Sequence, residues 1–294
     1  MTGIINVNKP SGWTSQDIVS KLRGILREKR IGHGGTLDPM AVGVLPVFVG
    51  RATGAVQFFE GADKEYTAGI RFGITTDTQD TTGKIISELP VNFTLAQLEA
   101  ALHSFTGELL QIPPMYSAVK VNGVPLYKIA RRGGETPRQP RTVAVYSAKI
   151  TGGGAAEYTV HFHVSKGTYI RTLCHDLGRS LGCGACMSGL VRTRAGMFTL
   201  EASHTLPEIE AAKQSGDFDE LLLPADVLWR DLPRFTASAG QERALKLGQA
   251  FRVDMPDGKL LVYGESGEFL SLSRTIGGAC TLIRGFFETG GAGK

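Results

Sequence analysis

The sequence has little of what marks three familiar classes of protein. Cysteine accounts for only four of its 294 residues, which excludes a small scaffold held together by disulfides. The longest apolar stretch, residues 41–50, is interrupted by Pro46 and is too short to cross a bilayer. The opening segment, MTGIINVNKP, lacks the basic and apolar regions of a signal peptide. We therefore expect a cytoplasmic protein that does not contact membranes.

Motifs that bind nucleotides are also missing. The chain has no Walker motif, and its glycines at 32, 34 and 35 lack the third glycine of a dinucleotide-binding fingerprint. We therefore expect no nucleotide cofactor. The composition is that of an ordinary globular protein, with 42% hydrophobic and 20% charged residues and a net charge of +4. Such a charge is compatible with a polyanionic partner but does not require one.

Three of the cysteines raise the question of a metal site. Cys183 and Cys186 have the spacing of a zinc ligand pair, and Cys174 lies upstream beside His175. The apolar stripe of the helix predicted there consists of Ile170, Leu173, Leu177 and Leu181. Because Cys174 and His175 fall off this stripe, the pattern favours buried or loop thiols over a zinc site. We expect no metal.

Hydrophobic periodicity predicts both strands and helices. Residues 66–72 and 158–164 alternate between apolar and polar side chains, as half-buried strands do. Capping-box patterns at residues 14–17 and 94–97 each precede a segment with apolar residues at helical spacing. Because these strands and helices do not alternate with regular βαβ spacing, we expect an α+β fold with a mixed, largely antiparallel sheet.

The composition changes twice along the chain. Residues 113–141 contain one acid, Glu135, and six basic residues, which are Lys120, Lys128, Arg131, Arg132, Arg138 and Arg141. Residues 201–231 are acidic and suit a connecting segment at the end of a large domain that starts at residue 1. Short strand patterns separated by turn residues then predict a small β-domain at 232–287. We expect residues 288–294 to be disordered.

One loop presents a single acid in an unusual setting. Asp38 follows the glycines at 32, 34 and 35 and directly precedes Pro39. Glycine can adopt positive φ and lets a bulky ligand approach the backbone, while Pro39 biases Asp38 toward an extended conformation. An isolated Asp-Pro pair most often marks a turn. The surrounding residues instead favour an aspartate with a chemical role.

Six ordered motifs between residues 3 and 200 resemble those of the TruB family of tRNA pseudouridine synthases. They are residues 8–15 (NKPSGWTS), 32–46 (GHGGTLDPMAVGVLP), 64–80, 113–120 (PPMYSAVK), 165–171 (SKGTYIR) and 190–198. Two positions depart from the family pattern. Gly34 stands where a threonine is expected, and Val191 stands where the first arginine of an LRRT run is expected.

The resemblance implies an enzyme that converts uridine at position 55, in the T-loop of tRNA, into pseudouridine. The C1′–N1 bond breaks, the uracil turns, and C5 is joined to C1′ without a cofactor. Because the uridine lies inside a folded arm, it has to be flipped out first. The resemblance also implies a catalytic domain of the pseudouridine synthase type over residues 1–231, an RNA-clamping insertion at 113–141, and a PUA-like RNA-binding domain at 232–287.

The resemblance assigns roles in the pocket to particular residues. Asp38 is the expected essential carboxylate, acting either as a nucleophile or as a base toward the ribose. Arg171 would pair with Asp38 and keep it ionised. Tyr66 would stack on the uracil and serve the final deprotonation of C5. Tyr169 and Leu190 are expected to form further pocket wall.

Other residues are expected to contact the RNA outside the reacting bond. His33 would support the flipped arrangement of the nucleotide. Phosphate contacts are expected from Lys9, Lys64, Arg131 and Arg132. The expected partner is the T-arm of tRNA, bound by a monomer that needs no other protein.

Two other functions remain open at this point. A guide-RNA-dependent enzyme of the same superfamily would work inside a ribonucleoprotein, and the compact C-terminal part argues against it. An RNA-binding tRNA-folding factor would act without chemistry. The presence of Asp38, Tyr66 and Arg171 argues against a purely binding role.

Overall fold

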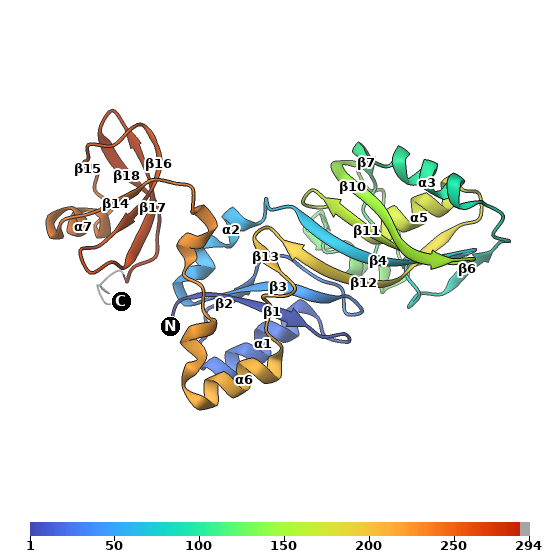
Figure 1. Cartoon of the computed structure of the whole chain (residues 1–294), viewed down its shortest axis with the longest axis horizontal. Helices are drawn as coiled ribbons and strands as arrows, with labels where there is room; N and C mark the ends of the chain where they lie inside the picture. Colours follow the sequence, from blue (N-terminus) through green and yellow to red (C-terminus); the bar gives the residue numbers. More distant parts are fainter. Residues whose placement is uncertain (289–294) are drawn as a thin grey trace.

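One large sheet runs through most of the chain in the computed structural model, which describes residues 1–288 (Figure 1). Its nine strands are arranged in the order β1-β3-β12-β4-β11-β10-β7, with β2 added to β3 and β13 added to β12. Their bounds are β1 Gly3–Lys9, β2 Ile31–His33, β3 Val42–Val49, β4 Lys64–Phe72, β7 Gly107–Gln111, β10 Arg141–Gly154, β11 Glu157–Val164, β12 Ala185–Ala195 and β13 Phe198–Thr199. Only the β12–β3 pair is parallel, so the predicted mixed, largely antiparallel sheet is confirmed.

The helices follow the predicted caps. Thr14 forms a capping box with Asp17 at the start of α1, and Thr94 does so with Gln97 at the start of α3. The α-helices are α1 Ser15–Leu26, α2 Val56–Phe59, α3 Leu95–Ser104, α4 Leu126–Ala130, α5 Ile170–Ser180, α6 Leu206–Ser215 and α7 Ala239–Lys246. Within residues 1–288 there are also three 3₁₀ helices: η1 Gly50–Ala55, η2 Asp217–Leu221 and η3 Ala225–Trp229.

The helices cover the sheet in two groups, which lie at opposite ends of the sheet in Figure 1. One core packs α3 and α5 against β4, β11 and β12, with Leu98 and Leu173 among its buried side chains. A second core packs α1 and α6 against β1 and β3 through residues such as Leu22 and Ile209. Truncating one such buried leucine to alanine costs about 2–5 kcal/mol.

The C-terminal part forms a second, curled sheet of the PUA-like kind. Its five strands have the order β14-β16-β17-β18-β15, with bounds β14 Arg234–Thr236, β15 Phe251–Arg252, β16 Gly258–Tyr263, β17 Phe269–Ile276 and β18 Ala279–Gly285. Two short hairpins complete the strands: β5 Ile74–Thr76 with β6 Ile85–Glu88, and β8 Lys120–Val121 with β9 Val124–Pro125. No helix within residues 1–288 is long and apolar enough to span a membrane.

The C-terminal sheet packs against the rest of the chain through aromatic side chains. Phe269 and Phe286 belong to the same apolar cluster as Phe48 and Phe59, and the Trp229 ring packs beside those of Phe269 and Phe286. Arg51 adds an ion pair of 2.7 Å to Glu288, the first residue of the segment expected to be disordered. The rest of that segment lies outside the described residues. The C-terminal sheet has its own core, which includes Leu260 and Leu270, and this aromatic cluster joins it to the large sheet.

Candidate active site

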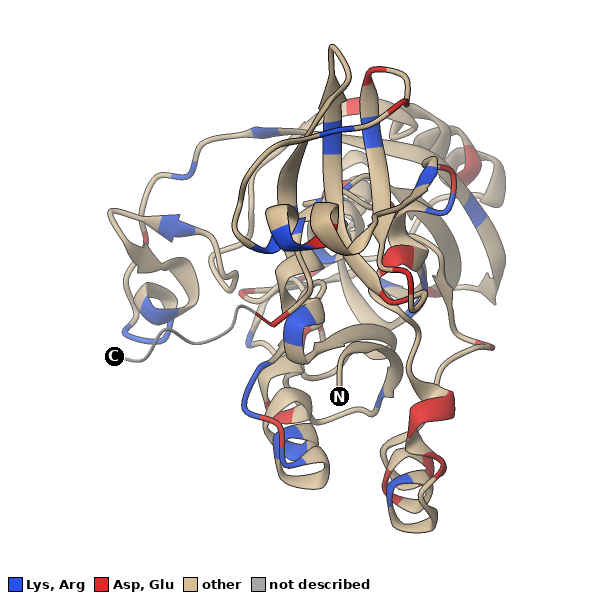
Figure 2. Ribbon diagram, turned by 90° about the vertical axis from the view of Figure 1, so that its left-hand side faces the viewer, with Lys and Arg blue, Asp and Glu red and all other residues tan. Residues whose placement is uncertain are grey.

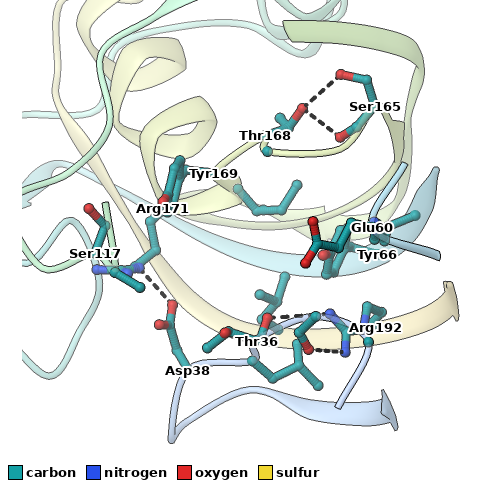
Figure 3. A pocket seen from close by; sticks show the side chains of 18 residues that line it. Thr36, Asp38, Glu60, Tyr66, Ser117, Ser165, Thr168, Tyr169, Arg171 and Arg192 are labelled. Atoms are coloured by element: carbon teal, nitrogen blue, oxygen red, sulfur yellow. Dashed lines mark hydrogen bonds and ion pairs between the residues drawn. The ribbon is translucent and has the colours of Figure 1, made fainter. Parts of the chain in front are cut away.

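The predicted pocket residues surround one cavity of about 290 Å³ (Figure 3). Its walls come from the glycine-rich loop, from β4 and β12, from the start of α5 and from the foot of the 113–141 insertion. The lining includes six of the predicted residues, namely Asp38, Lys64, Tyr66, Tyr169, Arg171 and Leu190. The fold thus brings together segments more than 100 residues apart in the sequence.

Asp38 and Arg171 form the ion pair at the centre of the pocket. The Nε atom of Arg171 lies 2.9 Å from Oδ2 of Asp38. The arginine side chain is only 5% exposed, and its Nη1 and Nη2 atoms donate to the backbone oxygens of Thr78 and Tyr116. The Asp38 side chain is 36% exposed, so its free oxygen remains reachable from the pocket. The guanidinium is therefore a fixed partner for an accessible carboxylate.

A second acid, Asp80, was missed by sequence reasoning. Its Oδ2 lies 3.8 Å from Nε of Arg171, on the buried side of the arginine. Its other oxygen accepts hydrogen bonds from the Thr82 backbone nitrogen at 3.0 Å and from the Thr78 hydroxyl at 2.8 Å. Asp80 ends the motif at residues 64–80, which was the only signal for it. Arg171 is thus held between two carboxylates.

The pKa of Asp38 reflects these neighbours. Burial raises the pKa of its carboxyl above the ordinary value, the Arg171 guanidinium opposes this rise, and Asp80 adds to it. A raised pKa means that the ionised form is lost at a higher pH than for a free aspartate. Arg171 is therefore the neighbour that most favours the ionised form of this partly buried carboxylate.

The loop that carries Asp38 is held from two elements. The Leu37 backbone nitrogen donates to the Ser15 hydroxyl at 2.8 Å, at the start of α1. From β12, the fully buried Arg192 donates to the backbone oxygens of Val44 at 2.6 Å and Gly35 at 3.1 Å. Sequence reasoning assigned no role to Ser15 or Arg192. Both fix the position from which Asp38 reaches into the pocket.

Lys9 was predicted to contact phosphate, and the structure corrects this. Its side chain is 0% exposed. The ammonium donates to the backbone oxygens of Pro10, Trp13 and Pro39, so all three of its donors are engaged inside the protein. Burial lowers its pKa to about 8. Lys9 instead ties the N-terminal motif to the residue that follows Asp38.

Gly34 explains one departure from the family pattern. A Cβ atom built there would lie 2.5 Å from Cδ1 of Phe59 and 3.0 Å from the ring of Phe48. Real Cβ atoms do not approach other atoms so closely, so the threonine expected from the family would displace the Phe59 ring. The other departure, Val191, lies half-buried on β12 opposite Val42 of β3.

Tyr66, Leu190 and Tyr169 all line the cavity. Tyr66 and Leu190 project from the neighbouring strands β4 and β12 and are largely buried. The Tyr169 backbone is fixed by Gln111, whose amide both accepts from its nitrogen at 2.7 Å and donates to its oxygen at 3.1 Å. Burial raises the pKa of the Tyr169 hydroxyl, which stays neutral. Gln111 is a further residue that sequence reasoning missed.

Of the two further residues expected to contact the RNA near the pocket, Lys64 lines the cavity and His33 does not. Lys64 lines it, and burial lowers the pKa of its ammonium to about 8. His33 does not line the cavity but ends β2 beside the Gly34 and Gly35 pair, where Nδ1 accepts a 3.4 Å hydrogen bond from Gly35. Burial lowers the pKa of its imidazole, with Arg192 adding to the effect. His33 is therefore neutral near pH 7.

A second carboxylate also reaches the cavity. Glu60, which follows α2, lines the pocket on the side of Tyr66, away from Asp38 in Figure 3. Unlike Asp38 it is exposed, and no arginine pairs with it in residues 1–288. The sequence singled out one acid, whereas the structure places Asp80 beside Arg171 and Glu60 in the cavity, and Asp38 is the one of the three that both lines the cavity and pairs with Arg171.

Arg131 and Arg132 are not brought to the pocket. Both are exposed and follow α4, with the Arg131 guanidinium 5.5 Å from the Tyr127 ring. Figure 2, which faces the side of the C-terminal sheet, shows basic and acidic residues interspersed over the chain. The insertion is nevertheless joined to the pocket at its foot, because the Tyr116 carbonyl accepts from Arg171 and Ser117 lines the cavity.

The cysteines of the metal alternative lie apart from any ligand set. Cys174, Cys183 and Cys186 are buried, and burial raises the pKa of each thiol. Across residues 1–288, no group of three or more His, Cys, Asp or Glu side chains is placed to hold a metal ion.

The sheet, the paired aspartate and the surrounding motifs define a pseudouridine synthase fold. Solved structures of similar fold include an H/ACA RNP bound to a substrate RNA containing 2′-deoxyuridine, with a TM-score of 0.72 and 26% identity over 98% of this chain and 86% of that one. A Cbf5-Nop10-Gar1 complex has a TM-score of 0.73 and 28% identity, covering 98% and 85%.

Sequence comparisons identify the family. The TruB family pseudouridylate synthase N-terminal domain matches residues 23–170, and the tRNA pseudouridylate synthase B C-terminal domain matches residues 171–229. The tRNA pseudouridine synthase B of Dehalococcoides mccartyi (strain ATCC BAA-2266 / KCTC 15142 / 195) is 41% identical over 93% of this chain and 92% of its own. That of Opitutus terrae is 48% identical over 72% and 88%. The chain belongs to the TruB family of pseudouridylate synthases.

Proposed function

We propose that this chain isomerises uridine to pseudouridine at position 55 in the T-loop of tRNA. The observation that carries the proposal is the accessible Asp38 carboxylate, ion-paired at 2.9 Å to a buried Arg171 in a pocket walled by Tyr66. The similarity to enzymes named tRNA pseudouridine synthase B supports tRNA as the substrate. The roles of the individual residues form part of the proposal.

Asp38 is the group that acts on the nucleotide. A uridine flipped into the cavity would place its ribose toward this carboxylate, which attacks the substrate or removes a ribose proton when the C1′–N1 bond breaks. Tyr66 and Leu190 confine the released uracil while it turns, and Tyr66 serves the deprotonation of C5. The apolar faces of Tyr66 and Leu190 would limit access of water to the uracil, so that rejoining at C5 competes with hydrolysis.

Glycosidases that hydrolyse such bonds use two carboxylates, one of which activates water. Here the second pocket carboxylate, Glu60, is exposed and lies on the opposite wall from Asp38. Asp80 is engaged by Thr78 and Thr82 and faces Arg171 rather than the cavity. The arrangement therefore favours isomerisation by one carboxylate over hydrolysis by a pair.

The chain divides into parts with different tasks under this proposal. Residues 1–231 hold the reacting nucleotide, the insertion at 113–141 contacts phosphates through Arg131 and Arg132, and residues 232–287 bind RNA. Because Phe286 of the C-terminal sheet packs into the same cluster as Phe59, deleting that sheet would expose part of the catalytic core. Point substitutions on its surface are therefore the appropriate test of its role.

The test uses the purified chain and an unmodified tRNA transcript, with no guide RNA and with EDTA present. We expect pseudouridine at position 55 and at no other uridine, detected by tritium release from labelled uridine and by chemical mapping. A requirement for added guide RNA and proteins would favour the ribonucleoprotein type of enzyme. Tight tRNA binding without any pseudouridine would favour a folding factor and would overturn the proposal.

A further inference from the structure

A second hollow adjoins the catalytic pocket along α5. Its volume is about 610 Å³, and its walls come from α5, from the end of α3, from β7 and from the insertion. Figure 1 shows α3, α5 and β7 grouped at one end of the molecule. We call it the α5 groove, and its principal lining residues are Gln79, Leu110, Ile112, Arg138, His175 and Arg179.

The floor of the α5 groove is apolar and unusually exposed. Leu110 on β7 is 71% exposed, and Ile112, just beyond the strand, is 48% exposed. β7 is the last strand in the order of the large sheet, so no strand of residues 1–288 pairs with its outer edge. Side chains this exposed add little to the stability of the fold. They offer instead a flat apolar surface of the kind on which a nucleic-acid base can rest.

The rim of the α5 groove carries positive charge. Arg138 is held in place by the Pro113 carbonyl and by Glu135, each at 3.2 Å, and Arg179 is exposed on α5. One acid, Asp176, also lines the groove, and burial raises the pKa of its carboxyl. The rim continues into the basic insertion at 113–141. Two guanidinium groups beside an apolar floor complement a phosphate joined to a base.

A buried polar atom in the wall also lacks a partner. Nδ1 of His175 is buried and makes no hydrogen bond within residues 1–288. Burial lowers the pKa of this imidazole, so the neutral ring presents one donor and one acceptor. Buried polar atoms without partners are rare in proteins, and a ligand that supplies the missing partner is one reason for them.

The α5 groove shares a wall with the catalytic pocket. The Thr172 hydroxyl donates to the Gln79 side chain at 2.9 Å, and both residues line the groove. Gln79 lies between Thr78, whose carbonyl accepts from Arg171, and Asp80, which faces the same guanidinium. A ligand in the groove would therefore lie directly behind the turn that holds Arg171.

We propose that the α5 groove binds a second nucleotide of the substrate RNA, with its base on Leu110 and Ile112 and its phosphate between Arg138 and Arg179. His175 would turn its ring so that the buried Nδ1 atom hydrogen-bonds the base edge. The proposal rests on the proposed function, because it takes the RNA in the catalytic pocket as the source of this nucleotide. It adds a recognition site outside the pocket that holds Asp38.

The first test compares two charge reversals of exposed arginines. Arg179→Glu should weaken binding of a T-arm hairpin about tenfold and lower the salt slope by nearly one unit. Arg71→Glu is the matched control, since Arg71 is exposed on β4 and alternates with the inward-facing Ile70 and Phe72. It should change affinity less than about twofold. Equal effects of the two reversals would contradict a specific site.

The second test uses a substitution that changes no charge and is not expected to affect folding. Leu110→Ser alters a side chain that is 71% exposed, so the melting temperature should not change. Affinity for the hairpin should fall several-fold if a base rests on this residue. Normal affinity in this variant would overturn the proposal and leave the α5 groove free for a protein segment.

A crosslinking experiment locates the nucleotide. T-arm hairpins with a single 4-thiouridine at successive positions should crosslink, at one position other than 55, to peptides covering residues 105–112 or 172–180. If the wild-type enzyme forms pseudouridine but gives no such crosslink, the proposal that the α5 groove binds a nucleotide is refuted, and the proposed function stands. If the wild-type protein has no isomerase activity, the proposed function is refuted. The affinities of the Arg179→Glu and Leu110→Ser variants would still show whether the α5 groove binds RNA.

Discussion

Asp80 and Arg171 should shift the pH dependence of the reaction in opposite directions. The acidic limb of the single-turnover rate reports ionisation of Asp38, whose pKa is raised by burial, lowered by Arg171 and raised by Asp80. Asp80→Asn removes a cause that raises this pKa, so activity should persist to lower pH. Arg171→Gln removes a cause that lowers it, so activity should be lost at higher pH than in the wild type.

The size of the Asp80 effect on the plateau rate follows from its distance to Arg171. Unit charges 3.8 Å apart attract with a gross energy of about 4 kcal/mol at an effective dielectric constant of about 20. Arg171 keeps its hydrogen bonds to Thr78 and Tyr116 in the Asp80→Asn variant. Its guanidinium therefore stays partly in place, and only a fraction of the gross energy is lost from the rate. We expect the plateau rate to fall about 10- to 100-fold, equivalent to about 1.4–2.7 kcal/mol.

The assay is the single-turnover rate at saturating enzyme from pH 5 to 8, with filter binding at each pH. Asparagine retains the size of Asp80 and can still accept from the Thr82 backbone nitrogen, so binding and melting temperature serve as controls. Acidic limbs that move in the same direction in both variants would refute the view that these two charges act through Asp38.

Three further predictions concern packing, proton transfer and RNA contact. Tyr66→Phe should keep the pocket wall but slow the final deprotonation; a wild-type rate for release of pseudouridine-containing RNA would leave Tyr66 only a packing role. Gly34→Thr should lower activity at least about tenfold by displacing Phe59, and Gly34→Thr combined with Phe59→Leu should recover part of it. Charge reversal at Arg131 and Arg132 should weaken tRNA binding and lower its salt slope by nearly two units, with an unchanged saturated rate; an unchanged slope would exclude phosphate contact there.

Local patterns in the sequence predicted the parts of the fold that depend on neighbouring residues. The capping boxes at Thr14 and Thr94 and the alternating strands at 66–72 and 158–164 all occur where their patterns lie. Contacts between side chains that are far apart in the sequence could not be predicted in this way. Periodicity could not show that Asp80 would face Arg171.

The errors have similar physical causes. Lys9 looked like a surface cation because charged residues are mostly exposed, yet its ammonium is enclosed by three carbonyls that only the folded chain brings together. The C-terminal strands were only partly predicted because β18 mixes exposed and buried apolar residues without clear alternation. The packing of Phe286 beside Phe59 depends on the relative position of two sheets, which no local pattern encodes.

The central claim is that the Asp38 carboxylate carries the chemistry and that tRNA binding depends on other contacts. Its most direct test is the single-turnover formation of pseudouridine 55 by Asp38→Asn, measured alongside tRNA affinity. We expect no product above background and an affinity within about tenfold of wild type, equivalent to less than about 1.4 kcal/mol. Measurable turnover by a variant free of contaminating enzyme would contradict the claim.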